Sequence, residues 1–207
     1  MPEAFLAIEA SQRDASVALR AVPGASAREW HVPAPDASHD HLMAVIDEAC
    51  RAAGVGPRDL RAIAVSCGPG GFTGLRVSCA TAKAIADATG CALVAVPSAL
   101  VVARTRARSG GLCEGPCAIQ LAQKAGSAWV SEILVEGGWP RLVSAGLRNA
   151  LAGDGPEGPW SALACLELGE AMLARGESVD PLHLLPIYPR PAEAVTLWEA
   201  RHGAKER

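Results

Sequence analysis

The chain has 207 residues, enough for one large or two small domains with a sizeable core. Its formal net charge of −3 argues against a free-standing nucleic-acid-binding domain, because such domains are usually basic. We find no apolar run of membrane-spanning length and no signal peptide at the start. Seven cysteines, an odd number without a secretory signal, indicate reduced thiols and a cytoplasmic protein.

The first half of the chain predicts three consecutive strands and then alternating helices and strands. Period-two alternation and short polar breaks mark the strands, and apolar residues at helical spacing mark the helices. The expected order is strands at 4–9, 15–20 and 27–32, a helix from Ser38 to about Gly54, a strand at 61–67, a helix from Val77 to Thr89 closed by Gly90, a strand at 91–96 and a helix after Pro97.

The pattern breaks in 106–115, where glycines gather just before Pro116, and we place a domain boundary there. The first domain would be 1–108 and the second, smaller one 109–207. In the second we expect strands at 116–122 and 128–135 and helices at 143–151, 161–175 and 191–202. Three strands followed by helix-strand-helix-strand-helix is the order of an actin-like or ribonuclease-H-like lobe. The predicted fold class is therefore α/β, with actin-like ATPase lobes of which the second is reduced.

A glycine-rich segment between a strand and a helix is the most informative part of the sequence. It comprises Gly68, Pro69, Gly70, Gly71, Phe72, Thr73, Gly74, Leu75 and Arg76. Such a loop presents backbone N–H groups and a helix dipole that suit an anion, and it equally permits close packing of the helix on a neighbour. The P-loop, the dinucleotide-binding pattern and the nucleophile elbow do not fit, so both interpretations stay open.

The same segment resembles the GPGSFTGLR-type motif of the TsaB (YeaZ-like) family, which acts in threonylcarbamoyladenosine modification of tRNA. Other parts follow the order of that family: 5–10 and 14–19 resemble its first two strands, and 186–190 resemble its P-x-Y-L-R tail. Ser38-His39-Asp40-His41-Leu42 resembles a short helix start, and Gly153-Asp154-Gly155 a glycine-aspartate turn.

The resemblance implies a non-catalytic subunit that binds and activates the TsaD transferase, with no cofactor of its own. A TsaE-like ATPase would join the complex, tRNA would be contacted only indirectly, and a homodimer would form when the chain is alone. The implied partner contact comprises the whole glycine-rich segment, 68–76, together with Leu42, Val45 and Ile46 of the preceding helix. Phe72 is the only large aromatic there and the expected anchor, and Arg76 is expected to pair with a partner carboxylate.

The helix after the glycines is rich in small residues, which permit close helix packing. This face could pack on the chain's own sheet or on a helix of a second protein, and sequence alone does not separate the two.

The chain also departs from the family pattern. Its first strand ends in Glu9 where the family commonly has Asp, and 121–129 lack the usual acid and arginine. In actin-like ATPases an acid at the end of the first strand helps to place magnesium, and Glu9 is one methylene longer than Asp. Asp154 lies between two glycines, where a turn is the usual role. We therefore expect ancestry in nucleotide binding without turnover.

Other reactive side chains give weak signals. Cys67 lies before a helix N-terminus, which favours a thiolate, but no base accompanies it in the sequence. Cys113 and Cys117 lack a second ligand pair at zinc spacing. His39 and His41 are two apart and would point to different helix faces. The H-x-x-x-H metal pair of TsaD is absent.

Three alternatives remain at this stage. The glycine-rich loop could serve an ATPase or transferase as a phosphate site. A peptidase role, sometimes attached to this superfamily, lacks a nucleophile signature. A self-associating scaffold without a catalytic partner would use the same helix face.

Overall fold

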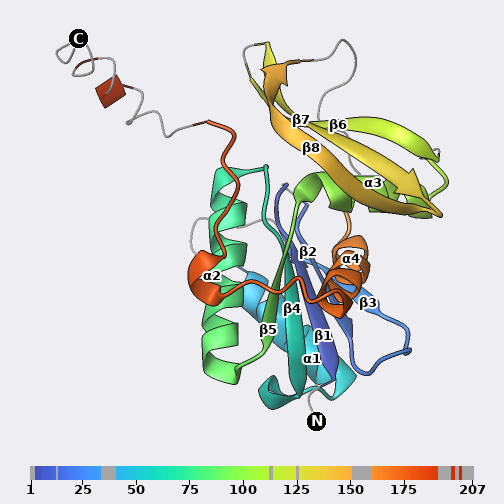
Figure 1. The fold of residues 1–207 in the computed structure, drawn as a ribbon. Coiled ribbons are helices and arrows are strands. Elements are labelled where there is room, and N and C mark those ends of the chain that lie inside the picture. The colour runs from blue at the N-terminus through green and yellow to red at the C-terminus, as the bar shows by residue number, and fades with distance from the viewer. Residues whose placement is uncertain are drawn as a thin grey trace.

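The computed structural model describes residues 3–12, 14–33, 41–111, 114–124, 126–150, 160–190, 197–198 and 201, with the backbone alone in 122–124. The elements form a five-stranded sheet and a three-stranded sheet with helices packed around them (Figure 1). In chain order they are β1 (Ala4–Glu9), β2 (Ser16–Arg20), β3 (Arg28–His31), α1 (Leu42–Ala53), η1 (Pro57–Asp59), β4 (Leu60–Ser66), α2 (Phe72–Thr89), β5 (Ala92–Val96), α3 (Ser98–Arg108), β6 (Gly115–Lys124), β7 (Ser127–Glu136), β8 (Trp139–Asn149), α4 (Ala162–Ala174) and η2 (Pro181–His183).

The larger sheet has the strand order β3-β2-β1-β4-β5. The first three strands form an antiparallel meander, and β4 and β5 continue in parallel with β1. Parallel strands need crossover helices, and α2 supplies the connection from β4 to β5. The carboxyl ends of β1, β4 and β5 therefore meet at one edge, where the glycine-rich segment begins.

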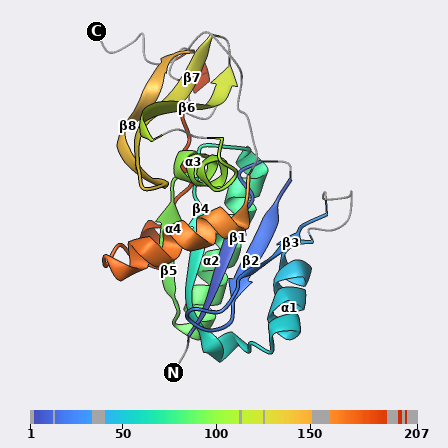
Figure 2. The ribbon, with the colours of Figure 1, turned by 90° about the vertical axis from the view of Figure 1, so that its right-hand side faces the viewer.

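Helices cover both faces of this sheet (Figure 2). Alternate residues of β1 point to opposite faces, as a strand requires. Leu6 and Ile8 pack in a cluster with α1 and α2, while Phe5 and Ala7 pack in a second cluster with α3 and α4. All four side chains are buried.

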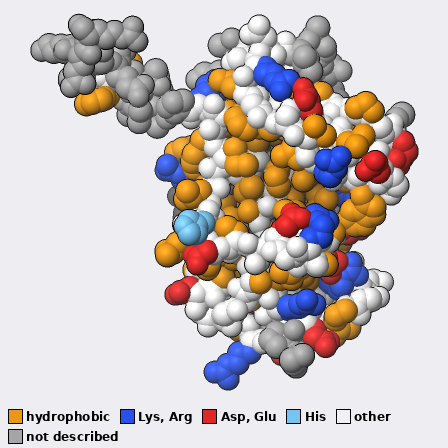
Figure 3. All heavy atoms as spheres, in the orientation of Figure 1, with side chains coloured by type: hydrophobic (Ala, Val, Ile, Leu, Met, Phe, Trp, Pro, Cys, Tyr) orange, Lys and Arg blue, Asp and Glu red, His pale blue; other side chains and the backbone are white. Residues whose placement is uncertain are grey.

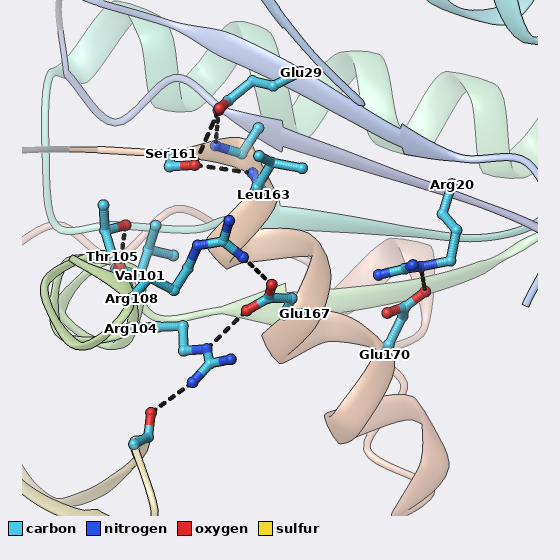
Figure 4. Close-up of polar contacts among 12 residues, drawn as sticks. Arg20, Glu29, Val101, Arg104, Thr105, Arg108, Ser161, Leu163, Glu167 and Glu170 are labelled. Atoms are coloured by element: carbon cyan, nitrogen blue, oxygen red, sulfur yellow. Dashed lines mark hydrogen bonds and ion pairs between the residues drawn. The ribbon is translucent and has the colours of Figure 1, made fainter. Parts of the chain in front are cut away.

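Polar contacts fasten α4 to the sheet and to α3 (Figure 4). The Glu29 carboxylate on β3 accepts a hydrogen bond from the Ala162 backbone N–H at 2.6 Å, at the first turn of α4. Arg20 on β2 pairs with Glu170 at 2.7 Å. Glu167 pairs with Arg104 of α3 at 2.8 Å and also with Arg108.

The smaller sheet, of order β6-β7-β8, packs on α3 through Ile119 and Ile133. After α4 the chain returns to the larger sheet, where the Val179 N–H donates to the Leu93 carbonyl oxygen. Residues 179–190, which we call the strap, then run beside α2 toward β7 (Figure 1). Arg190 donates to the Ser127 carbonyl oxygen at 3.0 Å.

Most of the predicted elements are confirmed, and so is the α/β fold class. Gly54 and Gly90 end α1 and α2 in the left-handed conformation, as expected for helix C-caps. The expected helix at 143–151 is wrong over its described part, because 143–149 belong to β8. There the chain pairs with β7 after the Gly137-Gly138 turn, and this pairing overrides the local helical spacing.

The division into 1–108 and 109–207 stays a prediction. The structure adds that α4, from the second range, packs on the sheet of the first. Ser38, and most of the helix expected at 191–202, lie outside the described residues.

Candidate functional site

The glycine-rich segment packs against the turn that follows β1. A Cβ added at Gly70 would lie 2.2 Å from the Ser11 carbonyl oxygen, and one at Gly74 would lie 2.1 Å from the Ala10 carbonyl oxygen. Cβ atoms do not approach oxygen so closely, so only glycine fits at these two positions. Close packing therefore accounts for both glycines.

Two backbone N–H groups of the segment are already used inside the protein. The Gly71 N–H donates to the Ser11 carbonyl oxygen at 2.7 Å, and the Gly68 N–H donates to Ser98 Oγ at 3.0 Å. A phosphate cradle needs such groups to point toward a ligand. Of the two interpretations left open by the sequence, the geometry supports packing.

Beyond these glycines, the first turn of α2 carries an exposed aromatic and cationic cluster with the strap. Arg76 Cζ lies 3.8 Å from the Phe72 ring centroid and 5.8 Å from that of Tyr188. Arg76 Nε donates to Tyr188 Oη at 3.0 Å, and the two rings lie 5.2 Å apart. Phe72 remains 51% exposed despite these contacts. Phe72, Arg76 and Tyr188 are called the aromatic cluster below.

Apolar side chains extend this surface along the strap. Leu182 and Leu185 are both largely exposed, and η2, which contains Leu182, packs beside α2. Figure 3 shows further hydrophobic side chains at the centre of the molecule, beside α2. On α2 itself Ala80 and Ala84 are exposed, while Cys79 and Ala82 face the sheet. The small residues therefore serve internal packing and also leave an outward stripe.

The predicted contact residues of α1 lie in the core. Leu42, Val45 and Ile46 are buried in the cluster between α1 and the sheet. Leu42 also lines a cavity of about 660 Å³ that Phe72, Thr73 and Gly74 border on the other side. The structure thus brings Leu42 next to the glycine-rich segment, whereas Val45 and Ile46 position α1. Their predicted role in a partner contact stays a prediction.

The remaining residues of the segment divide by burial. Gly68, Pro69 and Leu75 are buried, and Thr73 is exposed next to Phe72. The outward side chains available to a partner are therefore those of Phe72, Thr73 and Arg76.

Cys67 shows the opposite of an activated thiol. Burial raises its pKa to about 12, although it precedes a helix N-terminus. Its Sγ lies 3.4 Å from the Val96 carbonyl oxygen. Desolvation outweighs the helix dipole here, which argues against a nucleophilic role.

Glu9 is fully buried at the end of β1. Its Oε1 accepts hydrogen bonds from the Ser11 backbone N–H at 2.7 Å and from Ser11 Oγ at 2.5 Å. Burial raises the pKa of this carboxyl, partly offset by its hydrogen bonds. A neutral acid is thereby favoured.

Several further candidates were named from the sequence. His41 occupies the N-cap of α1, and Cys117 lies on β6. Among the described residues, no three His, Cys, Asp or Glu side chains lie close enough together to hold a metal ion. His39, Asp40, Cys113, Gly153, Asp154 and Gly155 lie outside the described residues.

Sequence reasoning missed the role of Tyr188. It belongs to the tail motif that supported the family resemblance, but nothing in that motif showed that its ring would meet Phe72 and Arg76. The contact joins residues 112 apart in the chain.

Comparison with solved structures identifies the fold. The structure matches an uncharacterised protein with similarity to peptidase YeaZ from Pseudomonas aeruginosa, with a TM-score of 0.76 at 24% identity over 91% of this chain and 100% of that one. YeaZ from Pseudomonas aeruginosa gives a TM-score of 0.75 at 24% identity, over 90% of this chain and 99% of the other. In fold, this chain is YeaZ-like. The resemblance stated from the glycine-rich segment is confirmed at this level.

Sequence comparisons connect part of the YeaZ-like chain to transferases. The family model of TsaD, tRNA N6-adenosine threonylcarbamoyltransferase, matches residues 33–127, just under half of the chain. Two tRNA N6-adenosine threonylcarbamoyltransferases, from Anaeromyxobacter dehalogenans strains 2CP-C and 2CP-1, are each 45% identical over 73 residues, or 33% of the chain. The chain spans only 22% of the length of these curated relatives. No described helix has both the length and the apolar character needed to cross a membrane.

Proposed function

We propose that this YeaZ-like chain is a non-catalytic subunit in threonylcarbamoyladenosine modification of tRNA, and that it binds and activates a TsaD-like transferase. The single observation that carries the proposal is the aromatic cluster, held half-exposed on a fold shared with YeaZ. Exposed aromatic and arginine side chains are the residues that most often anchor protein interfaces. The match of 33–127 to the TsaD family model supports the connection to this modification.

The proposed contact face consists of Phe72, Thr73 and Arg76 with the outward alanines of α2 and the apolar strap residues. It would receive a helix of the transferase, because small residues such as Ala80 and Ala84 let a second helix approach closely. A TsaE-like ATPase would join through the complex, and tRNA would be contacted by the transferase. The chain would work in the cytoplasm, and the same face would pair two copies when the transferase is absent.

The glycine-rich segment favours this role over nucleotide chemistry. Gly70 and Gly74 are required by the turn after β1, and the N–H groups of Gly68 and Gly71 are donated internally. We therefore assign the segment to fixing the start of α2, with catalysis left to the partner.

The test is co-purification of the chain with the TsaD-like transferase of its own source, comparing wild type with Phe72→Asp. A carboxylate placed in a desolvated contact costs about 3 kcal/mol or more, so the complex is expected to be lost. Val22→Asp is the matched control, because Val22 is 48% exposed in the turn after β2 and lies outside the proposed face. Absence of a complex with wild type would overturn the proposal, and magnesium-dependent nucleotide turnover would then support the ATPase alternative.

A further inference from the structure

Glu9 is a buried acid whose two oxygens have different surroundings. Oε1 receives both hydrogen bonds from Ser11, one from the backbone N–H and one from the hydroxyl. Oε2 is buried and has no hydrogen-bond partner among the described residues. The carboxyl thus holds the turn after β1 through one oxygen only.

The turn that Glu9 holds is the surface on which α2 begins. The Ser11 carbonyl oxygen accepts the Gly71 N–H, and Gly71 is the N-cap of α2. The carbonyl oxygens of Ala10 and Ser11 also lie against Gly74 and Gly70, with no room for a side chain. A shift of this turn must therefore displace the first turn of α2, which carries Phe72 and Arg76.

We propose that Glu9 is a positioning residue for the partner surface: its carboxyl fixes the Ala10–Ser11 turn, and that turn fixes the aromatic cluster. This inference rests on the proposed function, because the cluster is the contact assigned there. In actin-like ATPases an acid at the end of the first strand helps to place magnesium. Here the acid at the end of β1 would instead position the residues of the interface.

The shift of this carboxyl toward its neutral form is compatible with this task. Burial, the largest influence, raises the pKa of Glu9, and the charge of Glu29 raises it further, while the Ser11 hydrogen bonds and the nearby Ser66 hydroxyl oppose them. A neutral carboxyl still accepts the two Ser11 hydrogen bonds, and it carries a proton to donate. Glutamine has the same length and offers the same acceptor, with an amide donor in place of that proton.

Three substitutions separate the properties of this side chain. Glu9→Gln keeps length and hydrogen-bonding pattern, Glu9→Asp shortens the reach by one methylene, and Glu9→Ala removes the acceptor. We expect Glu9→Gln to bind the TsaD-like transferase within about twofold of wild type. The other two should bind at least about tenfold more weakly, which is about 1.4 kcal/mol, because the Ser11 donors lose their acceptor and the turn is no longer held. Glu3→Ala, at an exposed site just before β1 and outside the proposed contact face, is the control with unchanged affinity.

A local readout distinguishes positioning from general stabilisation. Amide hydrogen exchange of Gly71 should accelerate in Glu9→Asp and Ser11→Ala while amides of β4 keep their protection. Glu9→Gln should leave the Gly71 exchange as in wild type. This measurement needs no partner, so it tests the coupling even if Glu9→Ala fails to fold.

Two results would overturn the inference. One is Glu9→Gln weakening the complex as much as Glu9→Ala, which would show that charge and not reach is required. The other is Gly71 exchange and transferase affinity that stay unchanged in a folded Glu9→Asp protein. Failure of wild type to bind would overturn the proposed function instead, and the Gly71 exchange would still decide the coupling.

Discussion

The two faces of the five-stranded sheet are closed in different ways. On the α3 and α4 face, ion pairs and a cap fasten the helices, with Arg20–Glu170, Arg104–Glu167 and Glu29 at the N-terminus of α4. On the α1 and α2 face the packing is apolar. The aromatic cluster and two leucines of the strap, Leu182 and Leu185, are exposed there. Buried polar contacts specify an internal arrangement, whereas exposed apolar surface is the usual mark of an interface. We therefore propose that one face serves the internal structure and that the other is the recognition surface.

The largest effect on stability is expected from Gly74→Ala. The added Cβ would lie 2.1 Å from the Ala10 carbonyl oxygen, so backbone must move, at a cost of about 3 kcal/mol. Urea unfolding measures this difference. Gly146→Ala on β8 is the control, because an added Cβ there meets nothing within 4 Å. Equal stability of the two variants would contradict the packing role of Gly74.

On the opposite face, Glu29→Ala should destabilise the protein by about 2 kcal/mol. It removes the acceptor for Ser16 Oγ and the shorter of two acceptors for the Ala162 N–H, which keeps only the 3.1 Å bond to Ser16 Oγ. The same change should leave transferase affinity unchanged, because β3 is not part of the proposed contact. Weakened binding without loss of stability would break the division between the two faces.

A smaller effect is expected from Arg104→Lys. Arg104 joins α3, α4 and the β7–β8 turn, since it pairs with Glu167, donates to the Gly138 carbonyl oxygen and lies 4.0 Å from the Trp139 ring centroid. Lysine has no planar guanidinium and cannot make these contacts at the same time. We therefore expect thermal unfolding to show that the free energy of unfolding falls by about 1 kcal/mol. A variant as stable as wild type would show that the guanidinium of Arg104 contributes nothing beyond its positive charge.

The smallest effects concern the change of stability with pH, to which Glu9 and Glu132 should contribute with opposite sign. The pKa of Glu9 is raised by burial, so wild-type stability should fall as pH rises from the ordinary carboxyl pKa toward the raised one. Glu9→Gln should remove this slope and be more stable than wild type at neutral pH. The free energy of unfolding at several pH values measures this slope, and a parallel pH dependence of both proteins would contradict the raised pKa of Glu9.

Glu132 is the opposite case on the surface of the smaller sheet. Hydrogen bonds from Ser144 and Arg148 lower its pKa, so its contribution is present above the ordinary carboxyl pKa and is lost as pH falls through the lowered value. Because the pair is exposed, Glu132→Gln should change the acid limb only slightly.

Much of the fold was predictable because its signals are local. The alternation of side chains in β1 marks the strand itself, and the glycines that end α1 and α2 directly follow those helices. The helix expected at 143–151 is wrong over 143–149, because the apolar spacing there fits a helix as well as a strand and only pairing with β7 decides between them. At the site, Phe72 and Arg76 were found from the glycine-rich segment, whereas Tyr188 and the Glu29 cap depend on contacts more than 100 residues apart in the chain.

Hydrogen exchange of the chain with and without the TsaD-like transferase tests the division between the faces most directly. The account predicts that binding protects the start of α2 and the strap, over 68–84 and 179–190, and leaves α4 unchanged. Protection of α4 with none at the start of α2 would contradict it.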